Sequence, residues 1–193
     1  AEGCKWVDGE VKTPKGFKEA YQTYVEGGWP GMSHPEEFGG QALPYSLSSI
    51  IAEWFSGANH SWAMYPGLSQ GCMATIKAHG SELLQKMFLE KLVSGEWTGT
   101  MCLTEAHCGS DLGMLKCRAE PQEDGTYSLT GTKIFISAGE HDLSENIVHI
   151  VLARLPDAPE GTKGISLFVV PKFNVSEDGE KQDRNAVGCG SIE

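Results

Sequence analysis

The spacing of apolar residues changes once along this chain, close to Gly95, and that change limits the folds open to it. Before Gly95, apolar residues recur every three or four positions, which is typical of helices that bury one face. After Gly95, short β-branched and aromatic runs are separated by turn residues, which is typical of strands. Because the helices precede the strands, the order predicts an α+β fold and disfavours a doubly wound sheet.

Four helices are expected in the first half. The first two have apolar faces that we expect to be buried, formed by Phe17, Ala20, Tyr21, Tyr24 and Val25, and by Leu47, Ile50, Ile51, Trp54 and Phe55. We expect residues 27–28 to end the first and Gly57 to end the second. A third is expected over residues 68–79. Ser81 is placed to cap the start of a fourth, which ends before Gly95.

The second half is expected to hold short antiparallel strands with a turn every 8–12 residues, as in a small barrel or sandwich. A hairpin is predicted at Asp124-Gly125, before the run 127–130. Other strand-like runs cover residues 98–103, 133–137, 147–153 and 165–170. We therefore predict a helical domain over residues 1–95 and a β domain over residues 96–193, the latter incomplete.

Composition excludes several classes of protein. The chain has 26 acidic and 15 basic residues and a net charge of −11, which disfavours nucleic-acid binding. Its longest aliphatic run, Ile147–Ala153, is too short to span a membrane, and no signal peptide is recognisable. Six cysteines without C-x-x-C spacing suggest free thiols in a reducing, cytoplasmic location. His107-Cys108 has no second pair at ligand spacing, so no metal site is expected.

One short motif points to another chemistry. Gly67-Leu68-Ser69-Gln70-Gly71 matches the G-x-S-x-G pattern of a hydrolase nucleophile elbow. That elbow requires a buried strand before the serine, and residues 60–66 contain no strand-like run of Val or Ile. We therefore expect an ordinary helix after Pro66 here.

The stretch Met101–Asp111 combines features of a ligand-binding turn. Gly109 permits close approach to the backbone, and exposed N–H groups together with the Ser110 hydroxyl suit a phosphate. A capped turn with no ligand, in which Asp111 caps the backbone after Ser110, explains the same residues. Spacing alone leaves both interpretations open.

This stretch resembles the flavin-binding segment of acyl-CoA dehydrogenases, which usually reads T-E-P-x-A-G-S-D. Residues 29–40 resemble the W-x-G-x-x-x-P-E-E-x-G-G signature of that family, and residues 131–137 and 164–170 resemble its G-x-K-x-W-I-T and G-I-S-x-F-V-V strands. His79–Glu82 also matches the family pattern, as does Gly95-Glu96-Trp97, which precedes the flavin-binding segment. Within the family, the amino-acid sequence around Gly139–Asp142 looks most like that of the large bacterial members related to 3-methylmercaptopropionyl-CoA dehydrogenase.

The resemblance implies a helical domain, a middle β domain and a C-terminal helical bundle that this chain lacks. It implies FAD and the oxidation of an acyl-CoA thioester to the trans-2-enoyl-CoA, with 3-methylthiopropanoyl-CoA as one candidate. Thr104 would contact the pyrimidine side of the flavin, Ser110 the pyrophosphate and acyl-CoA, and Ser137 the region of N5. The full set expected at the cofactor is Met101, Cys102, Leu103, Thr104, Gly109, Ser110, Phe135, Ile136 and Ser137.

Several residues depart from the family pattern. Ala106 stands in place of the usual proline, His107 and Cys108 in place of small or neutral residues, and Phe135 and Ser137 in place of tryptophan and threonine. The family's catalytic glutamate lies far downstream, so no catalytic residue is expected within residues 1–193, and we expect this fragment to be inactive alone.

Partners and rival functions follow from the same resemblance. It implies an electron-transfer flavoprotein as electron acceptor and a homo-oligomer at full length. Two alternatives stay open: another flavoprotein on the same scaffold, either an acyl-CoA oxidase or a flavin monooxygenase, and a non-catalytic interaction module.

Overall fold

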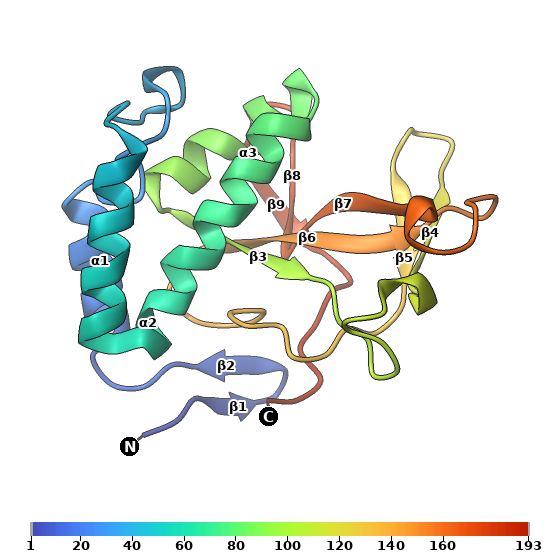
Figure 1. Ribbon diagram of the computed structural model, residues 1–193, viewed down its shortest axis with the longest axis horizontal. Helices are drawn as coiled ribbons and strands as arrows, with labels where there is room; N and C mark the ends of the chain where they lie inside the picture. Colours follow the sequence, from blue (N-terminus) through green and yellow to red (C-terminus); the bar gives the residue numbers. More distant parts are fainter. Residues whose placement is uncertain (1, 193) are drawn as a thin grey trace.

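The computed structural model describes residues 2–192 and places three helices beside a mixed β-sheet (Figure 1). The helices are α1 (Phe17–Glu26), α2 (Tyr45–His79) and α3 (Glu82–Ser94), with short 3₁₀ turns at Glu36–Phe38, Leu112–Met114 and Thr162–Gly164. The strands are β1 (Lys5–Val7), β2 (Glu10–Lys12), β3 (Trp97–Cys102), β4 (Arg118–Pro121), β5 (Tyr127–Thr130), β6 (Asn146–Arg154), β7 (Ile165–Pro171), β8 (Phe173–Val175) and β9 (Lys181–Arg184). The expected order of helices followed by strands is confirmed.

The ends of α3 follow the capping signals in the sequence. The Ser81 side chain accepts a hydrogen bond from the Leu84 N–H at 3.3 Å, as expected of an N-cap. Gly95 ends the helix at φ +82°, a left-handed conformation that favours glycine. The change from helix to strand falls between Ser94 and Trp97.

Helix α2 contains two helical segments that meet at a kink two residues after the predicted stop at Gly57, so two helices are found as predicted, but the expected start of the second at Leu68 is wrong. The helix bends at Asn59, whose φ of −159° and ψ of 94° are not helical. The Asn59 side-chain oxygen accepts a hydrogen bond from the Trp62 N–H at 3.1 Å and so caps the second half. Gly57 lies within the first half, where glycine is tolerated.

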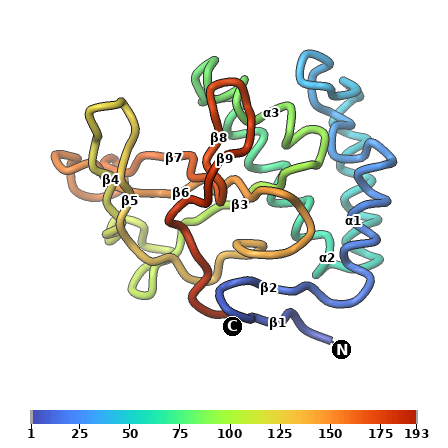
Figure 2. The backbone as a smooth tube through the Cα atoms, turned by 180° about the vertical axis from the view of Figure 1, so that it is seen from behind, coloured from blue at the N-terminus to red at the C-terminus, as the bar shows by residue number. Residues whose placement is uncertain are grey.

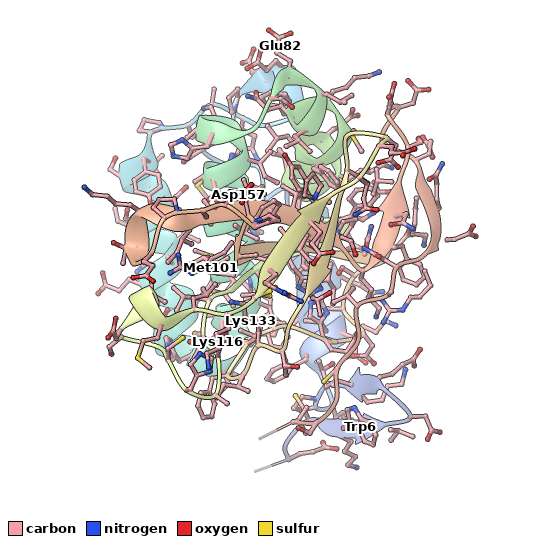
Figure 3. All side chains as sticks on the ribbon, turned by 90° about the vertical axis from the view of Figure 1, so that its right-hand side faces the viewer. Trp6, Glu82, Met101, Lys116, Lys133 and Asp157 are labelled. Atoms are coloured by element: carbon pink, nitrogen blue, oxygen red, sulfur yellow. The ribbon has the colours of Figure 1, made fainter. Side chains whose placement is uncertain are left out.

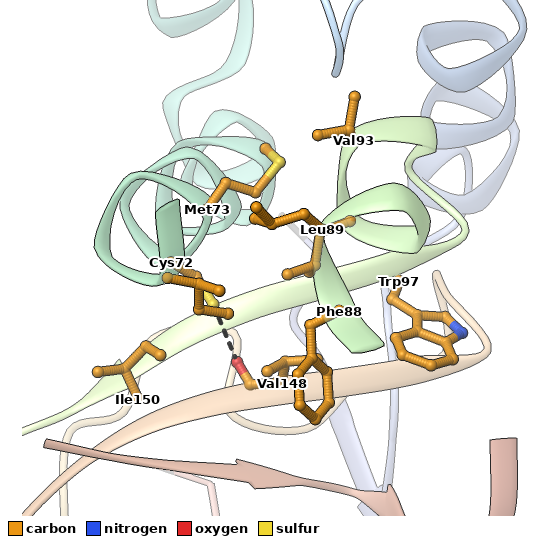
Figure 4. Packing of buried hydrophobic residues seen from close by; sticks show 10 residues of the cluster. Cys72, Met73, Phe88, Leu89, Val93, Trp97, Val148 and Ile150 are labelled. Atoms are coloured by element: carbon orange, nitrogen blue, oxygen red, sulfur yellow. Dashed lines mark hydrogen bonds between the residues drawn. The ribbon is translucent and has the colours of Figure 1, made fainter. Parts of the chain in front are cut away.

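The second half of α2 packs closely on the sheet. Gly99 of β3 lies so near that an added Cβ would be 2.3 Å from the Cys72 Cβ, so a larger residue there would push the helix away. The Cys72 thiol donates to the Val148 carbonyl of β6 at 3.6 Å (Figure 4). Around this contact lies a core cluster of Cys72, Met73, Ile76, Phe88, Leu89, Leu92, Val93, Trp97, Val148 and Ile150.

Ser69 of the G-x-S-x-G pattern belongs to this packing and not to a nucleophile elbow. It is buried within α2, donates to the Tyr65 carbonyl at 3.0 Å and accepts from the Gly99 N–H at 3.0 Å. Its hydroxyl therefore joins the helix to β3, which confirms the expectation of an ordinary helix.

The first half of α2 is less buried than predicted. Leu47, Ile50 and Trp54 were expected to face the core but are 43%, 46% and 66% exposed. Phe55 is half-buried and packs edge-on against Tyr24 and Trp62. The periodicity correctly identifies an apolar face, but only part of that face has a neighbour among the described residues.

The prediction of exclusively antiparallel strands is wrong. Strand β3 runs parallel to β6 from the pair Trp97–Asn146 to the pair Cys102–Val151, and β4 adds one parallel pair with β6. Strands β4 and β5 form the predicted hairpin, and β7 pairs antiparallel with β6. About forty residues separate β3 from β6, enough for a crossover, which a short hairpin turn would not permit. Strands β3–β7 form one open five-stranded sheet in place of the expected barrel, and β1–β2 and β8–β9 form two separate two-stranded sheets.

Two further differences concern short elements. Residues 133–137 form no strand, although Ile134, Phe135 and Ile136 are residue types that favour strands. Phe135 and Ala138 both have φ of +55°, which interrupts an extended backbone. Strands β1 and β2 form an unpredicted N-terminal hairpin that lies beside the C-terminal segment, where Trp6 donates to the Cys189 carbonyl at 3.0 Å (Figure 2).

Across residues 2–192, none of the helices combines the length and the apolar character that a membrane crossing requires.

Candidate functional site

Two segments far apart in the sequence are joined beyond the end of β3. The Ile134 N–H donates to the Thr104 carbonyl at 2.9 Å, and the Thr100 hydroxyl donates to the Ser137 carbonyl at 2.7 Å. The Lys133 ammonium donates to the Leu103 carbonyl at 3.1 Å. The structure thus brings residues 101–104 and 134–137 together, as the expected cofactor site requires.

Glu105 anchors this junction and is poorly suited to be a catalytic base. Its carboxylate accepts hydrogen bonds from the backbone N–H groups of Lys116 and Cys117 at 2.8 and 2.9 Å and from the Lys133 ammonium at 2.9 Å. Burial by itself raises the pKa of this carboxyl, but the donors outweigh burial, so the pKa lies below its usual value. A carboxylate held by three donors is a structural acceptor.

Apolar surface is exposed where the two segments meet. Phe135 is 71% exposed and Met101 is 40% exposed. Phe135 also has φ of +55°, a conformation that costs free energy in a bulky residue and that clusters at binding sites. Figure 3 shows Met101, Lys116 and Lys133 on the side of the molecule that carries this junction.

Three hydroxyl groups accompany this apolar surface. Within residues 2–192, the side chains of Thr104, Ser110 and Ser137 make no hydrogen bond. Ser110 and Ser137 are exposed and Thr104 is half-buried. Gly109 folds back on Thr104, since a Cβ on it would lie 3.4 Å from the Thr104 methyl group. These hydroxyls can donate to a ligand without breaking an existing bond.

One of the expected residues, Cys102, is placed less favourably. The Cys102 side chain is buried in the core below the site, and burial raises the pKa of its thiol to about 12, so only its backbone is available to a ligand. Asp111 accepts from the Gly113 N–H at 3.2 Å, which is the capped turn considered from sequence. Leu103, Gly109 and Ile136 are half-buried around the junction.

The residues that hold the site together were not predicted from the sequence. Lys133 was noted only within a motif, although it ties Leu103 to Glu105. Thr100 was not singled out, although it is a buried polar residue on β3 bonded to Ser137. One signal could have indicated Thr100: it is a polar residue within a short run that was expected to form a strand.

Comparison with known proteins identifies the class of protein that has this arrangement. The family model of the acyl-CoA dehydrogenase N-terminal domain matches residues 5–96, and that of the acyl-CoA dehydrogenase middle domain matches residues 100–190. Together they cover almost the whole chain. The chain belongs to the acyl-CoA dehydrogenase family, whose members are FAD-dependent oxidoreductases.

Individual relatives agree with this assignment. The chain is 50% identical over 192 residues to 3-methylmercaptopropionyl-CoA dehydrogenase of Ruegeria pomeroyi, covering 100% of this chain and 33% of that protein. This relative is of the bacterial type expected from the residues around Gly139–Asp142. The chain thus spans about a third of the length of that relative.

Solved structures also align with this fold. Butyryl-CoA dehydrogenase of Megasphaera elsdenii aligns with a TM-score of 0.70 at 28% identity, over 79% of this chain and 40% of that one. An acyl-CoA dehydrogenase of Bacillus anthracis in complex with FAD aligns with a TM-score of 0.67 at 31% identity, over 81% and 25%.

The residues at the junction fit a flavin on chemical grounds. A flavin ring needs an apolar surface against its plane and donors for the atoms that become negative on reduction. Phe135 and Met101 offer the apolar surface, and the hydroxyls of Thr104 and Ser137 can serve as the donors.

Proposed function

We propose that this chain forms the helical and middle domains of an FAD-dependent acyl-CoA dehydrogenase that converts an acyl-CoA thioester into the trans-2-enoyl-CoA. The observation that carries the proposal is the junction of residues 101–104 with 134–137, where Phe135 and Met101 are exposed. Membership of the family supports it. FAD, when bound, supplies the acceptor for the hydride of the substrate β-carbon.

The residues of this chain have binding and orienting roles in the proposal. Thr104 and Ser137 donate hydrogen bonds to the flavin, where they stabilise the negative charge of the reduced ring. Phe135, Ile136 and Met101 cover the ring and exclude water. The remaining contacts of the proposed set are made by Cys102, Leu103, Gly109 and Ser110, with Ser110 near the pyrophosphate and the acyl-CoA.

The base that removes the α-proton is proposed to lie outside this chain. Glu105 is occupied by three donors, and Asp111 caps its own turn. General-base catalysis requires a carboxylate beside the α-carbon, which the family supplies from its C-terminal helical bundle. That bundle would also cover the exposed face of α2.

The substrate and partners belong to the same proposal. The similarity to the Ruegeria pomeroyi enzyme makes 3-methylthiopropanoyl-CoA the first substrate to test. An electron-transfer flavoprotein is proposed as the electron acceptor, with a homo-oligomeric assembly in the cytoplasm.

A turnover experiment tests the whole proposal. The 193-residue chain and the full-length protein are each given FAD, a series of acyl-CoA thioesters and an artificial electron acceptor. We expect turnover by the full-length protein alone. Turnover by the chain would place the base within residues 1–193. A full-length protein that stays colourless with FAD would favour an interaction module, and rapid reaction of its reduced flavin with oxygen would favour an oxidase or monooxygenase.

A single substitution tests the role given to Thr104. Thr104→Val removes a hydroxyl and keeps the shape of the side chain, and a hydrogen bond to a charged group contributes about 1.5–3 kcal/mol. We expect a lower flavin potential or weaker FAD binding, with little change in the melting curve of the apoprotein. Loss of folding with normal flavin behaviour would show that Thr104 is structural. Ser49→Ala, on the exposed face of α2, is the control.

A further inference from the structure

The two unusual residues of the flavin segment, His107 and Cys108, lie in a turn that brings a third potential metal ligand to them. The Glu105 carboxylate, the His107 ring and the Cys108 thiol each offer one ligand atom, and these atoms lie within 4.8 Å of one another. Neither the imidazole nor the thiol has a role in the proposed flavin chemistry.

The backbone holds this turn in place. Glu105 and Cys108 exchange two hydrogen bonds, from the Glu105 N–H to the Cys108 carbonyl at 2.9 Å and from the Cys108 N–H to the Glu105 carbonyl at 3.0 Å. The His107 Nε2–H donates to the Met114 carbonyl oxygen at 3.0 Å and lies 3.5 Å from Glu105 Oε2, so a cation bound to this nitrogen would replace that hydrogen bond. The three side chains therefore converge without a change in the backbone.

Glu105 keeps capacity for one more partner. Its Oε1 atom accepts from Cys117 and Lys133, while Oε2 accepts only from the Lys116 N–H and is the atom nearest His107. A carboxylate oxygen has two lone pairs, so a second one on Oε2 is available to a cation.

We propose that Glu105, His107 and Cys108 form a binding site for one thiophilic divalent cation of the zinc class. Carboxylate oxygen, imidazole nitrogen and thiolate sulfur are all zinc ligands, and a water molecule completes a tetrahedral set. When the bond to sulfur forms, the Cys108 thiol loses its proton to solvent, so the carboxylate and the thiolate balance the charge of the cation.

Two features set the expected strength of this site. Bond lengths of about 2.0–2.3 Å place the ligands of one tetrahedral zinc ion roughly 3.3–3.6 Å apart, so the side chains must close by about 1 Å. The Lys133 ammonium, 2.9 Å from Glu105, opposes a second cation nearby. We therefore expect reversible binding, weaker than that of a closed structural zinc site. Since Gly109 and Ser110 follow directly, a bound cation would fix the turn that carries them.

The experiment uses Co²⁺ as a spectroscopic probe on the protein at its full natural length, after treatment with a chelator. A thiolate–Co²⁺ bond gives a near-ultraviolet charge-transfer band, which is measured as a difference spectrum against the same protein without Co²⁺. We expect this band in the unsubstituted protein and its loss on addition of Zn²⁺.

Matched variants identify the ligands. Cys108→Ser should abolish the band, and His107→Gln should weaken Co²⁺ binding at least tenfold. Cys189→Ser and His79→Gln make the same changes away from the turn and should leave binding unaltered. Circular dichroism checks that each variant folds. Absence of the band in the unsubstituted protein, or its persistence in folded Cys108→Ser, would overturn the proposal. FAD binding and turnover are not the readout, so failure here leaves the proposed function intact.

Discussion

The two halves of α2 have similar apolar patterns but opposite environments. In the second half, Met73 and Ile76 are 0% and 1% exposed against α3 and the sheet. In the first half, Tyr45 and Trp54 are 78% and 66% exposed. Periodicity therefore shows that a helix has a face to bury, but the neighbour that buries it is a property of the tertiary structure.

This difference separates two roles of apolar residues within one helix. The second half stabilises the described fold directly, because its side chains fill the space between α3 and the sheet. The first half presents contiguous apolar surface of the kind that marks interaction sites. Substitutions should therefore have large effects in one half and small effects in the other.

The largest effect is expected at Met73. Met73→Ala leaves a cavity in the core, where Met73 is fully buried, and such changes cost about 2–5 kcal/mol of the free energy of unfolding. Leu47→Ala, on the exposed half, is the control and should cost far less. Chemical denaturation of the 193-residue chain measures both. Equal losses would contradict the contrast between the two halves.

Lowering the pH is expected to reduce the stability of the fold by an intermediate amount, through His149 of β6. Burial first, then Arg184 and Lys172, lower the pKa of this imidazole to about 4, and its Nδ1 has no hydrogen-bond partner in residues 2–192. The unfolded chain binds the proton near pH 6.5 and the folded chain does not, so stability falls as pH falls from about 6.5 to 4. The slope from one such group is at most about 1.4 kcal/mol per pH unit.

His149→Phe should flatten this part of the pH profile, whereas His60→Gln, at an exposed position of α2, should not. Buried His141, whose pKa is lowered to about 3 chiefly by burial, contributes a slope of the same sign and remains in both variants. Thermal melting between pH 7 and pH 4 makes the comparison. A profile unchanged by His149→Phe would mean that His149 takes up its proton over the same pH range in the folded and unfolded chains.

The smallest effect is expected at Trp54. Because its side chain is 66% exposed, Trp54→Ala should change the stability of the 193-residue chain by no more than about 0.5 kcal/mol. The same substitution in the full-length protein should cost more if a C-terminal bundle covers this face. A loss above about 1 kcal/mol in the chain alone would show that the face is already covered.

Local signals predicted the elements that depend on local chemistry. The Ser81 cap, the Gly95 stop and the hairpin at Asp124-Gly125 all follow from the conformations that these residues favour. The bend of α2 was misplaced because Gly57 is a general helix breaker, while the Asn59 side chain caps the following turn through a specific hydrogen bond. Residues 133–137 were predicted as a strand because the run Ile134-Phe135-Ile136 has strand-forming residues, but a loop that exposes Phe135 accommodates the same residues.

For the candidate site too, local motifs were predictable from the sequence and long-range contacts were not. The motifs located residues 101–110 and 135–137 and indicated the family to which the chain belongs. They did not show that Lys133 and Thr100 hold the two segments together, because those contacts join residues about thirty positions or more apart.

The sequence by itself determined that α1–α3 precede the main sheet, the caps of α3 and the family, since each depends on residues close together in the chain. Only the tertiary structure decided that β3 pairs parallel with β6, that Gly99 must be small beneath Cys72, and that Glu105 serves as an anchor. The physical reason is that pairing, close packing and the occupation of a carboxylate depend on neighbours brought together by folding, which local spacing does not specify.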